Sequence, residues 1–397
     1  MRFPRFANPT AEWNRNFALI AVSVLGFGTF LGVQFALFNN FIVTRLGIEA
    51  HHLGFVESLR EVPGFMNALF IALMVHLAPS RVGAVALWIM GIGVMAYASV
   101  DTVTSLAVWS VVWSLGFHCY MPMQAVLALR HSPPGKKGRW LGQLNSVMGM
   151  ACLLAILVSM ALLPLVQYEG MYVLAGATVT LGGFALLLLP RESSSEGEKR
   201  FVLNARYRYY YALQFLQGCR RQMFLTFAIF AMVKVHGMPV ETTMVLILVN
   251  QIMTTAVAPA LGRMVDHYGE RIMLSASYIG LILVFTGYGF IVYLPALYVL
   301  YVLDNLIFFG DIAMTTYVNK IASDEDLKPT LSMGVTMNHV AAVIAPVTGG
   351  LVWHYFGYQV IFFAGAALAF ISLLVSQGVN AEKILAEDAA SVEPATR

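Results

Sequence analysis

The chain has 397 residues, of which 59% are hydrophobic and only 11% are charged, and its formal net charge is +3. Soluble domains carry about 25% charged residues because their surfaces face water, so this composition excludes a chain built of soluble domains alone. A net charge this small gives no reason to expect a nucleic-acid partner. We therefore expect most of the molecular surface to face lipid.

Twelve apolar segments follow one another along the sequence. A helix needs about 20 apolar residues to cross a bilayer, and lipid offers no partners to the backbone, so each segment is expected to be helical. The alternating pattern typical of a membrane β-barrel does not occur. The segments are residues 17–43, 53–77, 82–100, 103–129, 140–164, 170–190, 209–236, 241–262, 271–293, 296–318, 330–353 and 357–378. The sequence thus predicts an all-α membrane protein with twelve transmembrane helices.

A polar, charge-dense stretch separates the first six segments from the last six. It contains three consecutive serines followed by Glu196-Gly197-Glu198-Lys199-Arg200, a charge-dense run that cannot enter a bilayer. The predicted organisation is an N-terminal six-helix bundle at 1–190, a cytoplasmic linker at 191–208, a C-terminal six-helix bundle at 209–380 and a disordered cytoplasmic tail at 381–397.

Lysine and arginine are distributed very unevenly among the loops. With the N-terminus in the cytoplasm, one side of the membrane holds nineteen of them and the other side only Arg45 and Lys234. The positive-inside rule then predicts a multi-pass plasma (inner) membrane protein with both termini cytoplasmic. Four tyrosines at the start of the seventh segment are expected in the aromatic belt at the lipid interface: Tyr207, Tyr209, Tyr210 and Tyr211.

The sequence contains no recognisable cofactor or metal motif. Cys119, Cys152 and Cys219 all lie in apolar segments and form no CxxC pair, so we expect reduced packing residues. There is no GxxxxGK[ST] motif for ATP and no HExxH motif. The first apolar segment is too long for a cleavable signal peptide. We expect no cofactor and no metal, with a proton or ion gradient as the driving force.

The loop between the eighth and ninth segments carries the most specific motif. It reads Gly262-Arg263-Met264-Val265-Asp266-His267-Tyr268-Gly269-Glu270-Arg271 and resembles the cytoplasmic-loop signature of the major facilitator superfamily. Gly262 allows two helices to approach closely, and Asp266 can hold an arginine or a helix N-terminus. Gly269 supports the turn, while Arg271 anchors the next helix. We interpret these four residues as a gating motif.

The resemblance implies two six-helix bundles around a central cavity and transport by alternating access. The corresponding loop in the first half departs from the pattern, because Ser80 stands where the aspartate is expected. The resemblance selects no subfamily: the fourth segment lacks the arginine of drug/proton antiporters, and the fifth has only Pro164 near its end.

Ionisable side chains inside the apolar segments are the candidate site residues, because a charge in a bilayer is costly unless it faces a cavity or a partner. They are Glu57, Arg60, Glu61, His118, Arg220, Arg221, Asp304, Asp311 and His339. The third, sixth, ninth and twelfth segments contribute none. The resemblance implies that those four helices are peripheral and that the others line the cavity.

Helical spacing indicates which of the two arginines in the seventh segment faces the expected cavity. Both lie about eleven residues into it, roughly 16–18 Å along the axis and near the midplane. Arg221 shares a face with Gln217, so we expect Arg221 rather than Arg220 to face the cavity. Asn338 and His339 lie at a similar level of the eleventh segment.

Two interpretations of these charges follow. In the first, Arg221, alone or with Arg220, binds an anionic group of the substrate, and Glu61, Asp304 or His339 carries a coupled proton.

In the second interpretation the charges pair with one another and never touch substrate. Glu57 would pair with Arg60 three residues later, and the arginines of the seventh segment would pair with acidic groups of other helices. His118 would then be a hydrogen-bonded core histidine rather than a pathway residue.

The leading functional prediction is secondary active transport of a small, anionic solute, coupled to protons. Efflux of amphipathic compounds is the alternative. A membrane sensor is a further alternative, although the linker and the tail leave little room for an output domain. The expected partners are a small-molecule substrate and the lipid bilayer. We expect the protein to be a monomer and not to be an enzyme.

Overall fold

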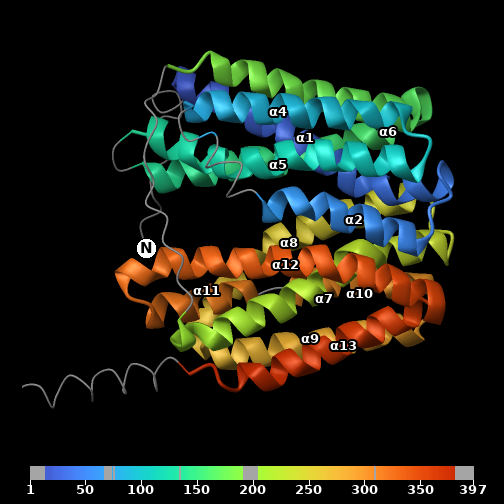
Figure 1. Cartoon of the computed structure of the whole chain (residues 1–397), viewed down its shortest axis with the longest axis vertical. Helices are drawn as coiled ribbons and strands as arrows, with labels where there is room; N and C mark the ends of the chain where they lie inside the picture. The colour runs from blue at the N-terminus through green and yellow to red at the C-terminus, as the bar shows by residue number, and fades with distance from the viewer. Residues whose placement is uncertain are drawn as a thin grey trace, which may run out of the picture. The chain divides into compact units, whose positions relative to one another are not determined.

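The computed structural model describes residues 14–66, 74, 77–133, 136–190, 204–307 and 310–380. Most of the predicted linker, residues 191–203, and the whole predicted tail, residues 381–397, lie outside this part of the chain. Every regular element among the described residues is a helix (Figure 1). The prediction of an all-α protein is confirmed.

Long helices joined by short turns make up both halves of the sequence. Those of the first half are α1 (Arg15–Thr44), α2 (Ala50–Phe65), α4 (Pro79–Met95), the 3₁₀ turn η2 (Ala96–Ser99), α5 (Val103–His131) and α6 (Lys137–Leu187). Those of the second half are the 3₁₀ turn η3 (Ala205–Tyr207), α7 (Arg208–Lys234), α8 (Val240–Tyr268), α9 (Glu270–Phe290), α10 (Leu294–Ile307), α11 (Gly310–Ile321), α12 (Asp324–Phe356) and α13 (Tyr358–Ser376).

The helices follow the predicted apolar segments with two differences. The label α6 covers both the fifth and the sixth segment, which meet at a break at Gln167, where φ is 57° and ψ is −176°. The tenth segment is instead divided into α10 and α11. Eight helices of the described residues are long and apolar enough to cross a membrane, and α10 is a shorter apolar helix.

Several helices begin at side chains that cap their first turn. The Asn14 side chain accepts a hydrogen bond from the Phe17 amide at the start of α1. Thr102 and Ser105 form a reciprocal capping box at the start of α5, and Ser323 caps α12. Caps satisfy amide groups that have no partner inside the helix, so they fix where each helix starts.

Contacts among the helices divide the chain into two units. Unit 1 comprises residues 1–46 and 62–197, and unit 2 comprises residues 47–61 and 198–397. The boundary cuts α2 just before Pro63, which removes one helical hydrogen bond at that point. The first three turns of α2 therefore belong, by their contacts, with the C-terminal helices. The predicted bundle boundaries at residues 190 and 208 stay a prediction.

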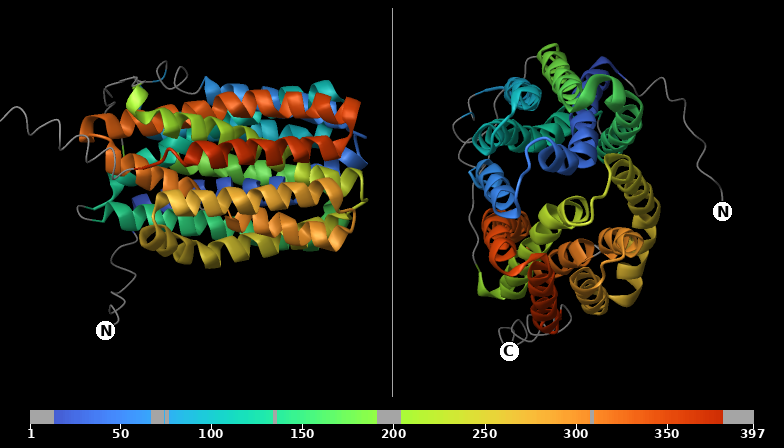
Figure 2. Two further views of the ribbon diagram at one scale, coloured as in Figure 1. Left: turned by 90° about the horizontal axis from the view of Figure 1, so that it is seen from below. Right: turned by 90° about the vertical axis from the view of Figure 1, so that its right-hand side faces the viewer.

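In unit 1, α1 lies along α6, and the helices of the unit run alongside one another (Figure 2). A Cβ added at Gly28 or Gly32 would overlap the backbone carbonyls of Met148 and Cys152. Small residues at these positions let the two backbones approach closely, as they do in membrane helix pairs.

In unit 2, tyrosines from the start of α7 lie in the core. Tyr207, Tyr210 and Tyr211 are 1%, 2% and 9% exposed and pack with residues of α9, α11 and α13. The Tyr207 hydroxyl also donates to Asp326 Oδ2 at 3.0 Å. The expectation that these three tyrosines face the lipid interface is wrong, because neighbouring helices cover their rings. Only Tyr209 stays partly exposed.

The three cysteines are free and buried, which confirms that they are reduced packing residues.

Candidate functional site

The first three turns of α2 lie against α12 inside unit 2, and this α2–α12 contact holds several candidate site residues. A Cβ added at Gly54 would overlap the carbonyl oxygen of Pro346, and one added at Gly350 would overlap the carbonyl of Ala50. Two glycines facing each other across a helix crossing allow backbone-to-backbone approach. The crossing therefore fixes the register of the two helices.

Polar contacts hold the same register on either side of the glycines. The Val347 amide donates to Ser58 Oγ at 2.9 Å. At the end of the contact that is predicted to face outward, Lys234 Nζ of α7 donates to Glu49 Oε1 at 2.7 Å. Glu49 immediately precedes α2, so this ion pair ties the start of α2 to α7.

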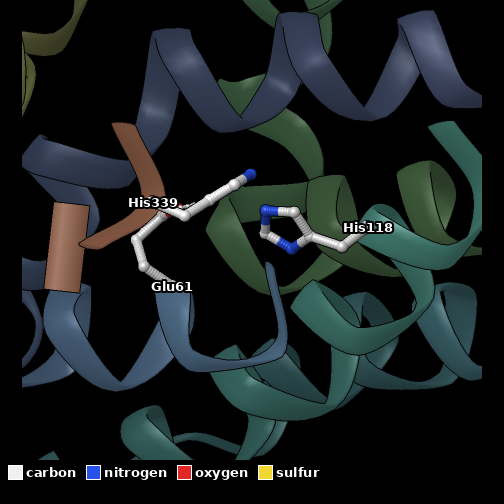
Figure 3. A group of neighbouring side chains, drawn as sticks. All are labelled: Glu61, His118 and His339. Atoms are coloured by element: carbon white, nitrogen blue, oxygen red, sulfur yellow. Dashed lines mark ion pairs between the residues drawn. The ribbon is translucent and has the colours of Figure 1, made fainter. Parts of the chain in front are cut away.

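Four charged side chains form a continuous network at the other end of the α2–α12 contact. The Arg60 guanidinium pairs with both Glu57 and Glu61, which confirms that Glu57 and Arg60 interact at the i, i+3 spacing. Glu61 Oε2 also lies 3.5 Å from His339 Nδ1 of α12 (Figure 3). The network thus runs from one helix to the other.

The network is partly open to its surroundings. The Arg60 and His339 side chains are 20% and 25% exposed, while that of Glu61 is 12% exposed and that of Glu57 only 6%. The contact therefore places an imidazole and a carboxylate from two helices next to each other while both stay partly accessible.

A second charged pair is sealed in the core of unit 2. Arg220 Nη1 of α7 donates to Asp304 Oδ1 of α10 at 3.4 Å, and the two side chains are 1% and 9% exposed. The guanidinium carbon lies 5.6 Å from the centre of the Phe285 ring, within the range of a cation–π contact. Arg220 is thus neutralised and covered, as the pairing interpretation expects.

Arg221 occupies a different environment from its neighbour. It is only partly buried, and it acts electrostatically on Asp304 together with Arg220. Gln217, expected on the same face as Arg221, is 2% exposed and packs beside Gly310 of α11. Asn338 of α12 lies against Gly218. Arg221, which helical spacing favoured in the sequence, is therefore the partly exposed arginine of the two. Gln217, which was expected to share its face, is buried in the core instead.

His118 of α5 belongs to unit 1 and is held within its own helix. The side chain is 8% exposed, and Nδ1 lies 3.0 Å from Ser114 Oγ and 2.9 Å from the Ser114 carbonyl oxygen. Its ring also packs edge-on against Phe117, with centroids 5.1 Å apart. These contacts are those of a hydrogen-bonded core histidine.

The loop motif lies at the junction of α8 and α9. Gly269 has φ +78°, a conformation that favours glycine, and both ends α8 and begins α9. Arg271 donates two hydrogen bonds to Gln377 Oε1, at 3.3 and 3.1 Å, and so links α9 to the end of α13. The surroundings of Gly262 and the side chains of Asp266 and Asp311 lie outside the described part of the structure.

Sequence reasoning missed the glycine crossing that positions the network. The signal was present as small residues four apart, Gly54 with Ser58 on α2 and Pro346 with Gly350 on α12. Such spacing places both small residues on one helix face, where close packing is possible. The partner helix, however, follows only from the three-dimensional contacts.

Unit 1 also contains an open hollow of about 470 Å³ between α1 and α6. Most of its lining is apolar, including Leu25, Met150 and Leu154, with Gln143 and Ser146 as polar members.

Part of the sequence matches a known protein family. Residues 210–383 match the family model described as Major Facilitator Superfamily. No curated protein sequence matches the chain.

Solved transporter structures resemble nearly the whole chain in fold. The nucleoside transporter NupG is 14% identical, and the match covers 92% of this chain and 99% of that one with a TM-score of 0.76. A bacterial homologue of the human lysosomal transporter Spinster, inward-facing and unoccupied, is 13% identical over 94% and 98% of the two chains, with a TM-score of 0.72. A D-xylose–proton symporter is 11% identical over 92% and 97%, with a TM-score of 0.71.

At these identities the structures establish the fold, and they confirm the predicted architecture of twelve transmembrane helices in two six-helix bundles. The family model adds the sequence signature of the C-terminal half, including the Gly262–Arg271 loop. Residues 210–383 thus match the Major Facilitator Superfamily in sequence, and the chain as a whole has the fold of solved membrane transporters.

Proposed function

We propose that this protein is a secondary active transporter that moves a small solute by alternating access and couples the movement to protons. The observation that carries the proposal is the Glu61–His339 pair, which joins α2 to α12 at 3.5 Å while both side chains stay partly accessible. A titratable pair that bridges two helices can link proton binding to the separation of those helices.

The coupling step follows from the charges of the network. When His339 carries a proton, it attracts the Glu61 carboxylate and holds α2 against α12. When the proton leaves, Glu61 keeps its ion pair with Arg60, but its attraction to the imidazole is lost. The α2–α12 contact then weakens, and Pro63 provides a point at which α2 can bend.

Arg221 is the proposed anion-binding group of the substrate site. Arg220 is unsuited to that role because Asp304 already neutralises it inside the core. A partly buried guanidinium offers paired N–H donors that match a carboxylate or a phosphate. The proposed substrate is therefore a small solute with an anionic group.

A flux screen in proteoliposomes tests the proposal. The panel contains a nucleoside, a pentose and a short peptide, chosen after the transporters that share this fold, together with anionic and cationic solutes. We expect an anionic member to accumulate only when a pH gradient is imposed, and Arg221→Ala to abolish its uptake while the protein still folds. Accumulation that ignores the pH gradient would refute proton coupling.

Efflux of amphipathic compounds is the second candidate function. The mainly apolar hollow between α1 and α6 favours it, because apolar lining with few polar groups is typical of sites for such ligands. Measuring the direction of transport separates the two candidates. Accumulation of a lipophilic dye inside inverted vesicles, with no flux of anionic solutes, would support efflux.

We also propose a membrane location and an orientation for the protein. The protein is a monomer in the plasma (inner) membrane with both termini in the cytoplasm, and Gly262, Asp266, Gly269 and Arg271 form the cytoplasmic gating motif. The uneven distribution of basic residues supports this orientation. Labelling of a single cysteine introduced beside Lys234, with an impermeant reagent outside the cell, tests it.

A further inference from the structure

Three histidines lie close together at the predicted outer end of the α2–α12 contact. This end is separate from the Glu61–His339 pair and from the Gly262–Arg271 loop motif. His51 and His52 lie at the start of α2, and His354 lies in the last turn of α12. The His51 ring centre is 3.9 Å from that of His52 and 4.5 Å from that of His354. Imidazoles from two helices thus share one small region.

The backbones that carry these histidines are held in place by packing. Gly350 lies one turn before His354, and a Cβ added there would overlap the carbonyl of Ala50 and press on His51 Cα. Trp353, beside His354, packs on Phe230 of α7 with ring centres 5.3 Å apart. The three rings do not present one nitrogen each to a common point in this arrangement, so binding of one ion requires rotation of the side chains.

One nitrogen of this cluster lacks a partner. His51 Nδ1 is buried and makes no hydrogen bond within the described part of the chain. Buried polar atoms are nearly always satisfied, so an unsatisfied imidazole nitrogen suggests that a ligand completes the site.

The charged groups beside the cluster favour a cation as the ligand. Glu49 immediately precedes α2, and Lys234 of α7 pairs with it at 2.7 Å. A carboxylate next to imidazoles is a typical addition to a set of nitrogen ligands for a dication.

We infer that His51, His52 and His354 form a binding site for a transition-metal dication, with Zn²⁺ as the fitting probe. Imidazole nitrogen is a preferred ligand of Zn²⁺, and three histidines leave one position of a tetrahedral site for water or for the nearby Glu49 carboxylate. Because the ligands come from both α2 and α12, a bound ion would tie the ends of the two helices together.

Calorimetric titration of the tag-free protein in detergent with ZnCl₂ tests the inference. We expect one Zn²⁺ per chain, and binding weakened on the order of 10- to 100-fold in His51→Ala and in His354→Ala. The control is His267→Ala, which removes an exposed histidine at the distant end of α8 and should bind as the unaltered protein does. Binding should also weaken as the pH falls, because protons compete for the imidazoles.

A second readout does not depend on transport. Zn²⁺ should raise the unfolding temperature of the unaltered protein and of His267→Ala, and should raise that of His354→Ala much less, because stabilisation by a ligand falls with its affinity. His354 is exposed, so its replacement leaves the fold intact even if His51→Ala does not fold. Absence of stoichiometric binding, or equal affinity and equal thermal shift in His354→Ala, would overturn the assignment.

Discussion

Two of the groups of charged residues described in unit 2 differ in how far the protein covers them. The Arg220–Asp304 pair is almost completely enclosed and lies beside the Phe285 ring. In the network of Glu57, Arg60, Glu61 and His339, the last three side chains are 12% to 25% exposed, while Glu57 at its inner end is 6% exposed. An enclosed pair cannot exchange protons or ligands without opening the core, whereas a partly open one can. We therefore propose a structural role for the first group and a role in proton coupling for the second.

Breaking the enclosed pair should have the largest effect on stability. Arg220→Met leaves the Asp304 carboxylate buried without its partner, and such changes cost about 3–5 kcal/mol. We expect a matching loss in the free energy of unfolding, measured by denaturant titration in micelles. The double change Arg220→Met with Asp304→Leu should recover most of that loss, because it removes both charges. Failure of the double variant to recover would show that the pair does more than neutralise itself.

Overfilling the helix crossing should have the next largest effect. Gly54→Leu places a side chain where the Pro346 carbonyl already lies, and overpacking of this kind costs about 1–3 kcal/mol. The same titration measures it. Gly149→Ala is the matched control, since an added Cβ there meets no atom within 4 Å. A Gly54→Leu protein as stable as the control would mean that α2 does not pack closely on α12.

Breaking the partly open network should affect stability much less than breaking the enclosed pair. Glu61→Gln removes the ion pairs to Arg60 and His339, but Arg60 keeps Glu57 as a partner. We expect a loss of about 1 kcal/mol or less in the free energy of unfolding, as for other accessible ion pairs. A loss as large as that of Arg220→Met would make the network structural and remove the contrast between the two groups.

The smallest effect should come from the loop motif. Arg271→Ala removes hydrogen bonds to Gln377 in an exposed setting, where water can replace them, and such surface substitutions usually change stability by less than about 0.5 kcal/mol. We expect a barely measurable change in stability, with Lys replacing Arg as the conservative control. A large destabilisation by Arg271→Ala would place this arginine among the structural charges.

Sequence reasoning predicted the helices and the identity of the charged residues, because apolar length and the cost of charge in lipid are local properties. Helical spacing also favoured Arg221 over Arg220 as the cavity-facing arginine, and that choice stays a prediction. Sequence reasoning failed for Tyr207, Tyr210 and Tyr211, because a tyrosine near a membrane interface can face either lipid or neighbouring helices, and only tertiary packing decides. The Glu61–His339 pair and the histidine cluster depend on the register of α2 against α12. Two helices separated by about 280 residues carry no local signal of that register.

Solute-driven proton movement in the Glu61→Gln protein tests the central assignment most directly. Proteoliposomes carry a pH-sensitive dye, the solute identified by the flux screen is added outside, and its passive exchange is measured in parallel. The account predicts that the unaltered protein couples solute entry to proton entry, while Glu61→Gln still exchanges solute but no longer moves protons or concentrates solute under a pH gradient. Unchanged proton movement and accumulation in Glu61→Gln would contradict it.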